Sequence, residues 1–162
     1  MIKHYVYADP HFYHKNIIEY TQRPFTSIQE MNETIINNHN TMINKRDKVF
    51  ILGDFCLAGK DKTIALAQRL KGYKILILGN HDKGRSLQFW YEVGFQEVIK
   101  YPIIVQKQYV FSHEPMPMSQ STPYINVHGH IHNNVLDSTK HRNVSLDVTD
   151  FNPVELGCLK NC

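Results

Sequence analysis

Residue types that bind metal ions gather in a few short stretches of this sequence. Its 10 histidines stand against a single tryptophan, and an imidazole is a costly core residue unless its nitrogens are satisfied. Such an excess is more typical of metal binding or acid–base chemistry than of packing. The stretches are Asp9-Pro10-His11, Gly53-Asp54, Gly79-Asn80-His81-Asp82, Ser112-His113-Glu114 and Asn126–His132.

The last of these stretches holds three histidines within five residues. His130 and His132 are two positions apart, so in an extended strand their side chains share one face, whereas on a helix they would diverge. Gly129 allows the backbone to approach whatever the pair surrounds. Together with carboxylate and amide oxygens, these imidazoles suit Mn²⁺, Fe, Ni²⁺ or Zn²⁺, while an all-oxygen set would favour Mg²⁺ or Ca²⁺.

Three of the stretches follow short apolar runs that are typical of strands buried on both faces. These runs are Ile2–Ala8 before Asp9, Val49–Leu52 before Asp54, and Ile75–Leu78 before Asn80. Open α/β sheets keep their ligand sites just beyond the carboxyl ends of their strands. We therefore expect the polar residues to meet at one edge of a sheet.

Helix signals alternate with these runs. Ser27 and Glu30 form a capping box, a second helix is expected from Asp61 to about Leu70, and Ser86 can cap a third. Their residues at helical spacing are Met31, Ile35, His39 and Met42 in the first and Leu66 and Leu70 in the second; the third contains Phe89, Trp90 and Val93. Strands and helices in alternation predict right-handed parallel crossovers.

The alternation of strands and helices ends after the third helix. Further strands are predicted at residues 98–101, 103–105, 109–111, 125–127 and 144–148. So many strands in so short a chain indicate a second sheet packed on the first. We therefore predict an α/β fold, a four-layer αββα sandwich of two mixed β-sheets flanked by helices, in a single domain that spans residues 1–162.

The overall composition is that of an ordinary globular protein, with 42% hydrophobic and 20% charged residues. A net charge of +3 and an isoelectric point near 8.7 give weak support to a nucleic-acid partner and none to a polybasic membrane contact. No apolar run approaches the ~18 residues of a membrane span, and there is no signal-peptide pattern. We expect a cytoplasmic protein whose three cysteines are free thiols.

In this order, the stretches resemble the motifs of the calcineurin-like metallophosphoesterase superfamily, in particular its small single-domain bacterial and phage-type members. The resemblance runs from Asp9 to His132 and implies the metallophosphatase fold without a cap domain. It also implies two divalent metal ions, with Mn²⁺ the expected metal and Ni²⁺, Fe²⁺/Fe³⁺ or Zn²⁺ as alternatives. The implied ligands are Asp9, His11 and His132 for one ion and Asn80, His113 and His130 for the other, with Asp54 bridging the two.

The resemblance further implies hydrolysis of phosphomonoester or phosphodiester bonds, and we expect nucleotides or nucleic-acid-derived substrates. A metal-bridging hydroxide would attack phosphorus, and His81 would act as general acid to the leaving oxygen. Asp82 is placed to orient neighbouring groups. The family often has a further Asp after its Gly-Asp motif, where this chain has Phe55-Cys56-Leu57, so the carboxylate that supports His81 is left open.

His14, Arg23 and Asn80 are the residues that we expect to contact substrate phosphate, Arg23 through its bidentate guanidinium. The expected partner is a small phosphorylated substrate, such as a nucleotide or nucleic acid, and we expect no membrane contact. The protein is expected to be a monomer or a homodimer. Taken singly, an Asp after a strand can be a turn residue and a His in a loop a surface residue. Only the joint order and spacing argue for a site.

A non-catalytic metal-binding scaffold on the same fold is the alternative function, because relatives that lose the acid histidine take that role. His81 and all seven implied ligands are present, which favours the enzyme. A structural single-zinc protein would not explain why Asp54 and Asn80 accompany the histidines.

Overall fold

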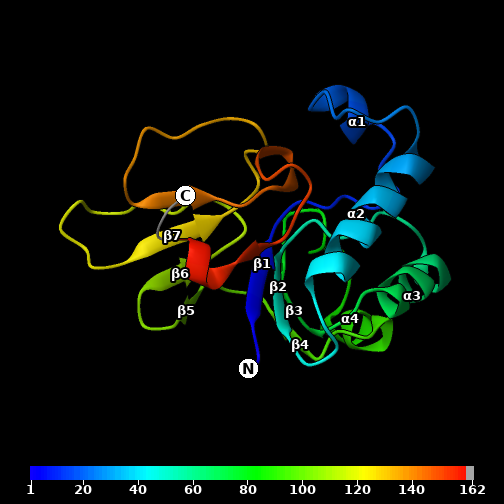
Figure 1. Ribbon diagram of the computed structural model, residues 1–162, viewed down its shortest axis with the longest axis horizontal. Helices are drawn as coiled ribbons and strands as arrows, with labels where there is room; N and C mark the ends of the chain where they lie inside the picture. The colour runs from blue at the N-terminus through cyan, green and yellow to red at the C-terminus, as the bar shows by residue number, and fades with distance from the viewer. Residues whose placement is uncertain (160–162) are drawn as a thin grey trace.

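The computed structural model describes residues 1–159 and contains two β-sheets packed against each other, with α-helices on one side (Figure 1). The first sheet has the strand order β4-β3-β2-β1-β9, and the second has the order β5-β6-β7-β8. Both combine parallel and antiparallel pairs, which confirms the predicted α/β fold with two mixed sheets. The elements are β1 (His4–Tyr7), α1 (Ile17–Tyr20), α2 (Ile28–Met42), β2 (Lys48–Leu52), α3 (Lys60–Arg69), β3 (Tyr73–Ile77), α4 (Leu87–Val93), β4 (Glu97–Ile99), β5 (Ile103–Val105), β6 (Tyr109–Phe111), β7 (Ile125–His128), β8 (His141–Asn143), the 3-10 helix η1 (Leu146–Val148), β9 (Val154–Glu155) and the 3-10 helix η2 (Leu156–Cys158).

The strands β1, β2 and β3 run parallel, and Leu52 at the end of β2 pairs with Ile77 at the end of β3. In β1, Tyr5 and Tyr7 belong to the core on the helix side, while Val6 belongs to the core shared with the second sheet. Burial on both faces explains why these strands are continuously apolar in the sequence. All three strands therefore deliver their following loops to the same edge of the sheet.

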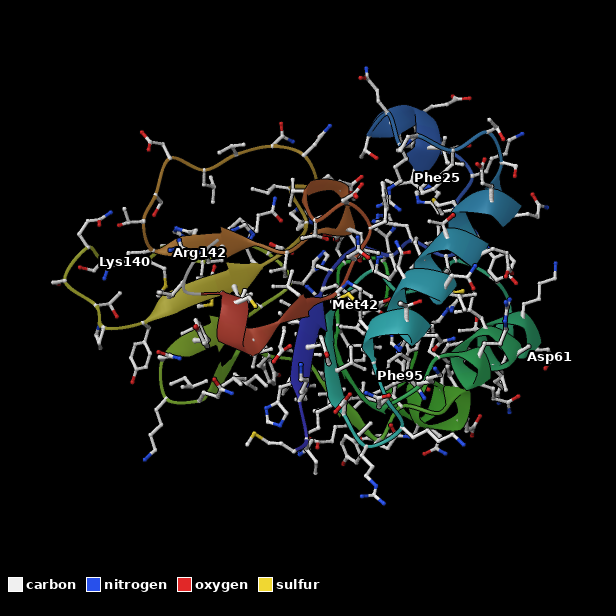
Figure 2. All side chains as sticks on the ribbon, viewed as in Figure 1. Phe25, Met42, Asp61, Phe95, Lys140 and Arg142 are labelled. Atoms are coloured by element: carbon white, nitrogen blue, oxygen red, sulfur yellow. The ribbon has the colours of Figure 1, made fainter. Side chains whose placement is uncertain are left out.

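The α-helices cover the face of the first sheet that points away from the second (Figure 1). α2 begins as predicted, because the Ser27 hydroxyl accepts a hydrogen bond from the Glu30 amide at 3.1 Å, and Ser86 caps α4 in the same way. The predicted cap of α3 is wrong. Its N-cap is Gly59, and Asp61 lies in the first turn at the outer end of the helix (Figure 2), where a carboxylate complements the helix dipole. None of the helices within residues 1–159 is long and apolar enough to cross a membrane.

The second sheet packs on the other face of the first. Tyr109, Phe111 and Val127 form a core with Val6 and Phe50 of the first sheet, and the rings of Phe50 and Phe111 meet edge to face with 5.2 Å between centroids. In the described part of the chain no α-helix follows β4, so the α-helical cover lies on the five-stranded sheet. The link between β6 and β7 is rich in proline, which does not continue a helix.

The predicted strand at residues 144–148 is wrong, because this segment forms the end of a crossing between the two sheets and then η1. The Ala8 amide donates to the Val144 carbonyl at 2.8 Å, and the Leu146 amide donates to the Ala8 carbonyl at 3.0 Å. Residues 144–148 are thus apolar for a reason other than strand formation: they join the second sheet to the end of β1. It continues to β9, an unpredicted strand that pairs antiparallel with β1.

Candidate metal centre

The predicted ligands meet beyond the carboxyl ends of the strands and form two groups. Within each group, the potential ligand atoms all lie within 4.8 Å of one another. They come from the loops after β1, β2, β6 and β7, which are distant in sequence. The first group is Asp9, His11 and His132, and the second is Asp54, His113 and His130.

The first group contains two buried atoms without a hydrogen-bond partner among the described residues, Asp9 Oδ1 and His11 Nε2. Since an unsatisfied buried polar atom costs about 1–3 kcal/mol, a cation between them suits the residues present. The Nδ1 atoms of the two imidazoles have partners. His11 Nδ1 lies 3.2 Å from His14 Nδ1, and His132 Nδ1 lies 2.9 Å from Asp147 Oδ2. Such partners orient imidazoles that bind metals.

The second group brings several hydrogen-bond acceptors face to face. His113 Nδ1 donates to the Leu52 carbonyl at 2.8 Å, so in the neutral ring it is Nε2 that carries the lone pair. Three further acceptor atoms surround this Nε2: Asn80 Oδ1 at 2.8 Å, His130 Nδ1 at 3.2 Å and Asp54 Oδ2 at 3.4 Å. Acceptors converge in this way when a cation is bound between them. The Asn80 amide oxygen therefore lies beside the second group.

The Asp54 carboxylate stands between the two groups. Its Oδ2 lies 3.5 Å from His11 Nε2 and 3.4 Å from His113 Nε2. Its Oδ1 accepts a hydrogen bond from the His81 amide at 2.9 Å, which fixes the orientation of the carboxylate. This position fits the bridging role that the resemblance implies.

Five of the candidate ligands have backbone φ angles in the left-handed region. Such angles are uncommon outside glycine, and each costs on the order of 1–3 kcal/mol. Strain of this kind persists only where the surrounding structure enforces it, so the loops that carry these ligands are held in place by their neighbours. The residues are Asp9 (57°), His11 (49°), Asp54 (54°), His130 (69°) and His132 (51°).

Two glycines let the backbone pass directly over the ligand carboxylates. A Cβ atom at Gly79 would collide with the Asp54 carboxylate. One at Gly129 would collide with the Asp9 carboxylate and the Ala8 side chain. Glycine is therefore required in both motifs for a steric reason.

At His11 and Asp54, the electrostatics favour the protonation states that bind metal. Burial lowers the pKa of His11 to about 2, so its ring is neutral. Burial would raise the pKa of Asp54, but the hydrogen bond and charge of His113 lower it to about 2. For His113, burial acts to lower the pKa, and the Asp54 and Asp9 carboxylates outweigh it and raise the pKa to about 9. Without a metal, a proton on His113 thus partly neutralises the carboxylates.

Arg23, which was predicted to bind substrate, lies behind the first group and is only 4% exposed. Its guanidinium forms a bidentate pair with Asp147 at 2.9 and 2.8 Å and also donates to the carbonyls of Asp9 at 2.8 Å and Pro10 at 3.1 Å. Burial would raise the pKa of Asp147, but hydrogen bonds from His132 and Arg23 hold it well below its usual range. The structure therefore gives Arg23 a positioning role instead of a place facing substrate.

His81 and His14 line the solvent side of the centre. The His81 side chain is 45% exposed, and its Nε2 lies 4.0 Å from Asp54 Oδ2. Its ring meets that of His11 edge to face with 5.5 Å between centroids, and the ring of His14 lies 6.0 Å away. Both predicted residues are therefore within reach of a molecule bound at the centre.

Asp82 binds backbone amides. Its carboxylate accepts hydrogen bonds from the amides of Asp54 at 2.7 Å, Gly79 at 2.9 Å and Phe55 at 3.1 Å. These bonds tie the loop after β2 to the loop after β3. Because none of them involves the His81 ring, Asp82 acts on the site through the position of Asp54 and Gly79.

Sequence reasoning missed one residue of the centre, Asp147. The signal was an aspartate inside the apolar run at residues 144–148, where a lone carboxylate must find a partner if the run is buried. The expectation of a regular strand concealed this signal.

Comparisons with known proteins agree with this geometry. The calcineurin-like phosphoesterase family matches residues 2–160. The uncharacterized protein MJ1445 of Methanocaldococcus jannaschii is 36% identical over 168 residues, which cover 96% of this chain and 88% of that protein. The crystal structure of AQ665 from Aquifex aeolicus, a protein of unknown function, has the same fold, with a TM-score of 0.79 at 23% identity over 99% of both chains. This chain therefore belongs to the calcineurin-like phosphoesterase family, hydrolases that use a dinuclear metal centre.

Proposed function

We propose that this chain hydrolyses phosphomonoesters or phosphodiesters at a centre of two divalent ions. The observation that carries the proposal is the Asp54 carboxylate, which lies 3.5 and 3.4 Å from imidazole nitrogens of two separate ligand groups. Ions bound in the two groups would activate a water molecule and hold the phosphoryl oxygens.

Seven side chains are assigned to the two ions. Since two divalent ions carry four positive charges and the two aspartates supply only two negative ones, the centre stays cationic and attracts phosphate. Asp9, His11 and His132 would hold one ion, Asn80, His113 and His130 the other, and Asp54 would contact both.

His81 is the residue that we assign as general acid. Its half-exposed ring borders the centre beside Asp54 without belonging to either ligand group. A protonated ring nitrogen at this position can pass its proton to the leaving oxygen, and such assistance is typically worth about 10²–10⁴-fold in rate. His14, whose ring lies beside that of His81, is assigned to contact substrate phosphate.

Manganese is the metal that we propose, because mixed imidazole, carboxylate and amide ligands suit it. Ni²⁺, iron and Zn²⁺ share that preference. We further propose a cytoplasmic monomer or homodimer that acts on a small phosphorylated substrate. The buried, free thiol of Cys56 agrees with a reducing compartment.

The test uses metal-stripped protein with p-nitrophenyl phosphate and bis(p-nitrophenyl) phosphate as paired monoester and diester substrates. Mn²⁺ or Ni²⁺ should restore turnover of at least one substrate, and elemental analysis should find two ions per chain. Absence of turnover with every one of Mn²⁺, Ni²⁺, Zn²⁺ and Mg²⁺, despite full loading, would instead support the alternative, a non-catalytic metal-binding scaffold.

A further inference from the structure

A groove leads away from the second ligand group across the surface. His113 forms part of its wall, and the groove passes Lys83, Lys100 and Tyr101. A second hollow is lined by the same three residues and continues to Leu87. The two hollows have volumes of about 260 and 420 Å³. We call this continuous surface, from His113 past Lys83, Lys100 and Tyr101 to Leu87, the lysine groove.

The lysine groove is positively charged. The Lys83 side chain is 60% exposed, and the Glu114 carboxylate, which also lines the groove, lies 4.0 Å from it, a separation at which an exposed pair contributes little. Lys100 is exposed, and its side chain has no hydrogen bond or ion pair among the described residues. The third cation, Arg85, is committed to the carbonyls of the β2–α3 loop. Two ammonium groups are therefore available to a ligand.

An aromatic ring stands beside these lysines without a packing role. Tyr101 is 74% exposed, whereas the large aromatic residues of the core are almost completely buried. Across the first hollow, Pro115 and Pro117 supply apolar walls. A flat exposed ring beside cations is the arrangement that proteins use to stack the bases of a single strand while holding its phosphates.

We propose that the lysine groove binds a single-stranded nucleic acid whose phosphodiester bond reaches the metal centre. Lys83 and Lys100 contact phosphates that flank the reacting one, and Tyr101 stacks on a base. The proposal rests on the phosphoesterase function proposed above and specifies its substrate class. A phosphorylated peptide would also be attracted by the lysines, but it would give Tyr101 no base to stack on.

The test compares a ten-residue oligothymidylate with bis(p-nitrophenyl) phosphate, which is too small to occupy the groove. Tyr101→Ala and Lys100→Gln should each lower kcat/KM for the oligonucleotide by about fivefold or more, as expected for loss of a stacking or phosphate contact. Both should leave kcat/KM for the small diester unchanged. Tyr101→Trp should retain the oligonucleotide activity because it keeps a stacking surface.

Lys45→Gln is the matched control, since Lys45 is an exposed lysine before β2, at the sheet edge opposite the metal centre. It makes the same charge change and should have no effect on either substrate. Raising the salt concentration should weaken oligonucleotide turnover, and the slope of log kcat/KM against log salt should be shallower for Lys100→Gln than for Lys45→Gln.

The outcomes separate the groove from the chemistry. Equal losses on both substrates, or no loss on the oligonucleotide, would overturn the groove assignment while hydrolysis of the small diester still supports the phosphoesterase. An effect of Lys100→Gln without any effect of Tyr101→Ala would point to a peptide and overturn the nucleic-acid assignment. If neither substrate is hydrolysed, binding of a labelled oligonucleotide can still be measured by fluorescence anisotropy. Weaker binding to Tyr101→Ala would support the nucleic-acid assignment of the groove, and unchanged binding would refute it.

Discussion

The Arg23 guanidinium binds the Asp147 carboxylate through two hydrogen bonds, from Nε to Oδ1 at 2.9 Å and from Nη2 to Oδ2 at 2.8 Å. Both side chains are buried. Asp147 also bonds to the His132 ring, and Arg23 bonds to the Asp9 carbonyl, so the pair holds two ligands of the first group from behind. In the second group, the Nδ1 atom of His113 bonds to a neutral backbone carbonyl instead of a carboxylate. We therefore expect the first ion to be bound more tightly than the second.

Substitution of Asp147 should weaken one metal site selectively. Asp147→Asn removes the charge that orients His132, and loss of such a partner typically lowers metal affinity by about 10–100-fold. Calorimetric titration of metal-free protein with Mn²⁺ should show the tighter of two binding events weakened and the other kept. Asp137→Asn, a change to an exposed aspartate, is the control. Equal weakening of both events would contradict the selective role.

Loss of the Arg23 side chain should cost considerable stability. Arg23→Met leaves Asp147 charged and buried without its partner, which typically costs about 3–5 kcal/mol. Urea unfolding in the presence of a chelator measures this loss without metal effects. Arg69→Met breaks the exposed pair with Glu33 and should cost less than about 1 kcal/mol. Similar losses for the two variants would show that the buried Arg23–Asp147 pair stabilises the fold no more than an exposed ion pair does.

The assignment of His81 as general acid predicts a dependence on the leaving group. His81→Gln should lower kcat by about a hundredfold or more while two metal ions remain bound. The loss should be greater for phenyl esters than for p-nitrophenyl esters, because a more basic leaving oxygen needs the proton more. Turnover that falls equally with both leaving groups would argue against proton donation by His81.

The position of Asp54 predicts a loss of both ions. Asp54→Ala removes the oxygen that lies between the two groups, whereas Asp147→Asn touches the first group alone. Elemental analysis after gel filtration should find neither ion retained in Asp54→Ala. Retention of two ions per chain would exclude the bridging role.

His39 gives a pH dependence of stability that is independent of the metal centre. The ring is buried between the Tyr7 hydroxyl and the Lys71 carbonyl, and burial lowers its pKa from 6.5 to about 4. Because the unfolded chain binds the proton more readily, the stability from His39 is complete above pH 6.5 and is lost as the pH falls to 4. The loss amounts to about 3 kcal/mol.

The measurement compares the wild-type chain with His39→Gln, both metal-free, between pH 4 and 7.5. The difference in the free energy of unfolding should shrink by about 3 kcal/mol as the pH falls through this range. Other acid-sensitive groups are common to both chains and cancel. Parallel pH profiles would show that His39 does not titrate in this way.

The candidate ligands could be predicted because each follows an apolar strand that is recognisable by itself. Asp9, Asp54 and Asn80 come directly after runs that are buried on both faces, and parallel strands bring their following loops to one edge. His130 and His132 were recognisable as a dense histidine motif, but the extended strand that their spacing indicated is wrong. β7 ends at His128, both residues have left-handed φ angles, and each belongs to a different ligand group. The apolar runs and the histidine motif depend on local sequence, which a single chain displays.

The supporting residues could not be predicted because their partners are distant in the sequence. Arg23 resembles a phosphate-binding residue until Asp147, 124 positions away, is placed beside it. The run at residues 144–148 has the composition of a strand, and only its bonds to Ala8 show that it crosses between sheets. Likewise, the sequence identified Asp82 as a carboxylate near the site, but it did not predict that this carboxylate accepts hydrogen bonds from three amides in two loops.

The crossing of residues 144–146 beside Ala8 sets the order in which the protein can mature during synthesis. A nascent chain that has left the ribosome only as far as His132 has every strand that leads to the centre, yet Asp147 is still inside the exit tunnel and His132 lacks the carboxylate that orients it. The first ligand group is therefore completed last, and we expect it to bind its metal only after Asp147 has been synthesised.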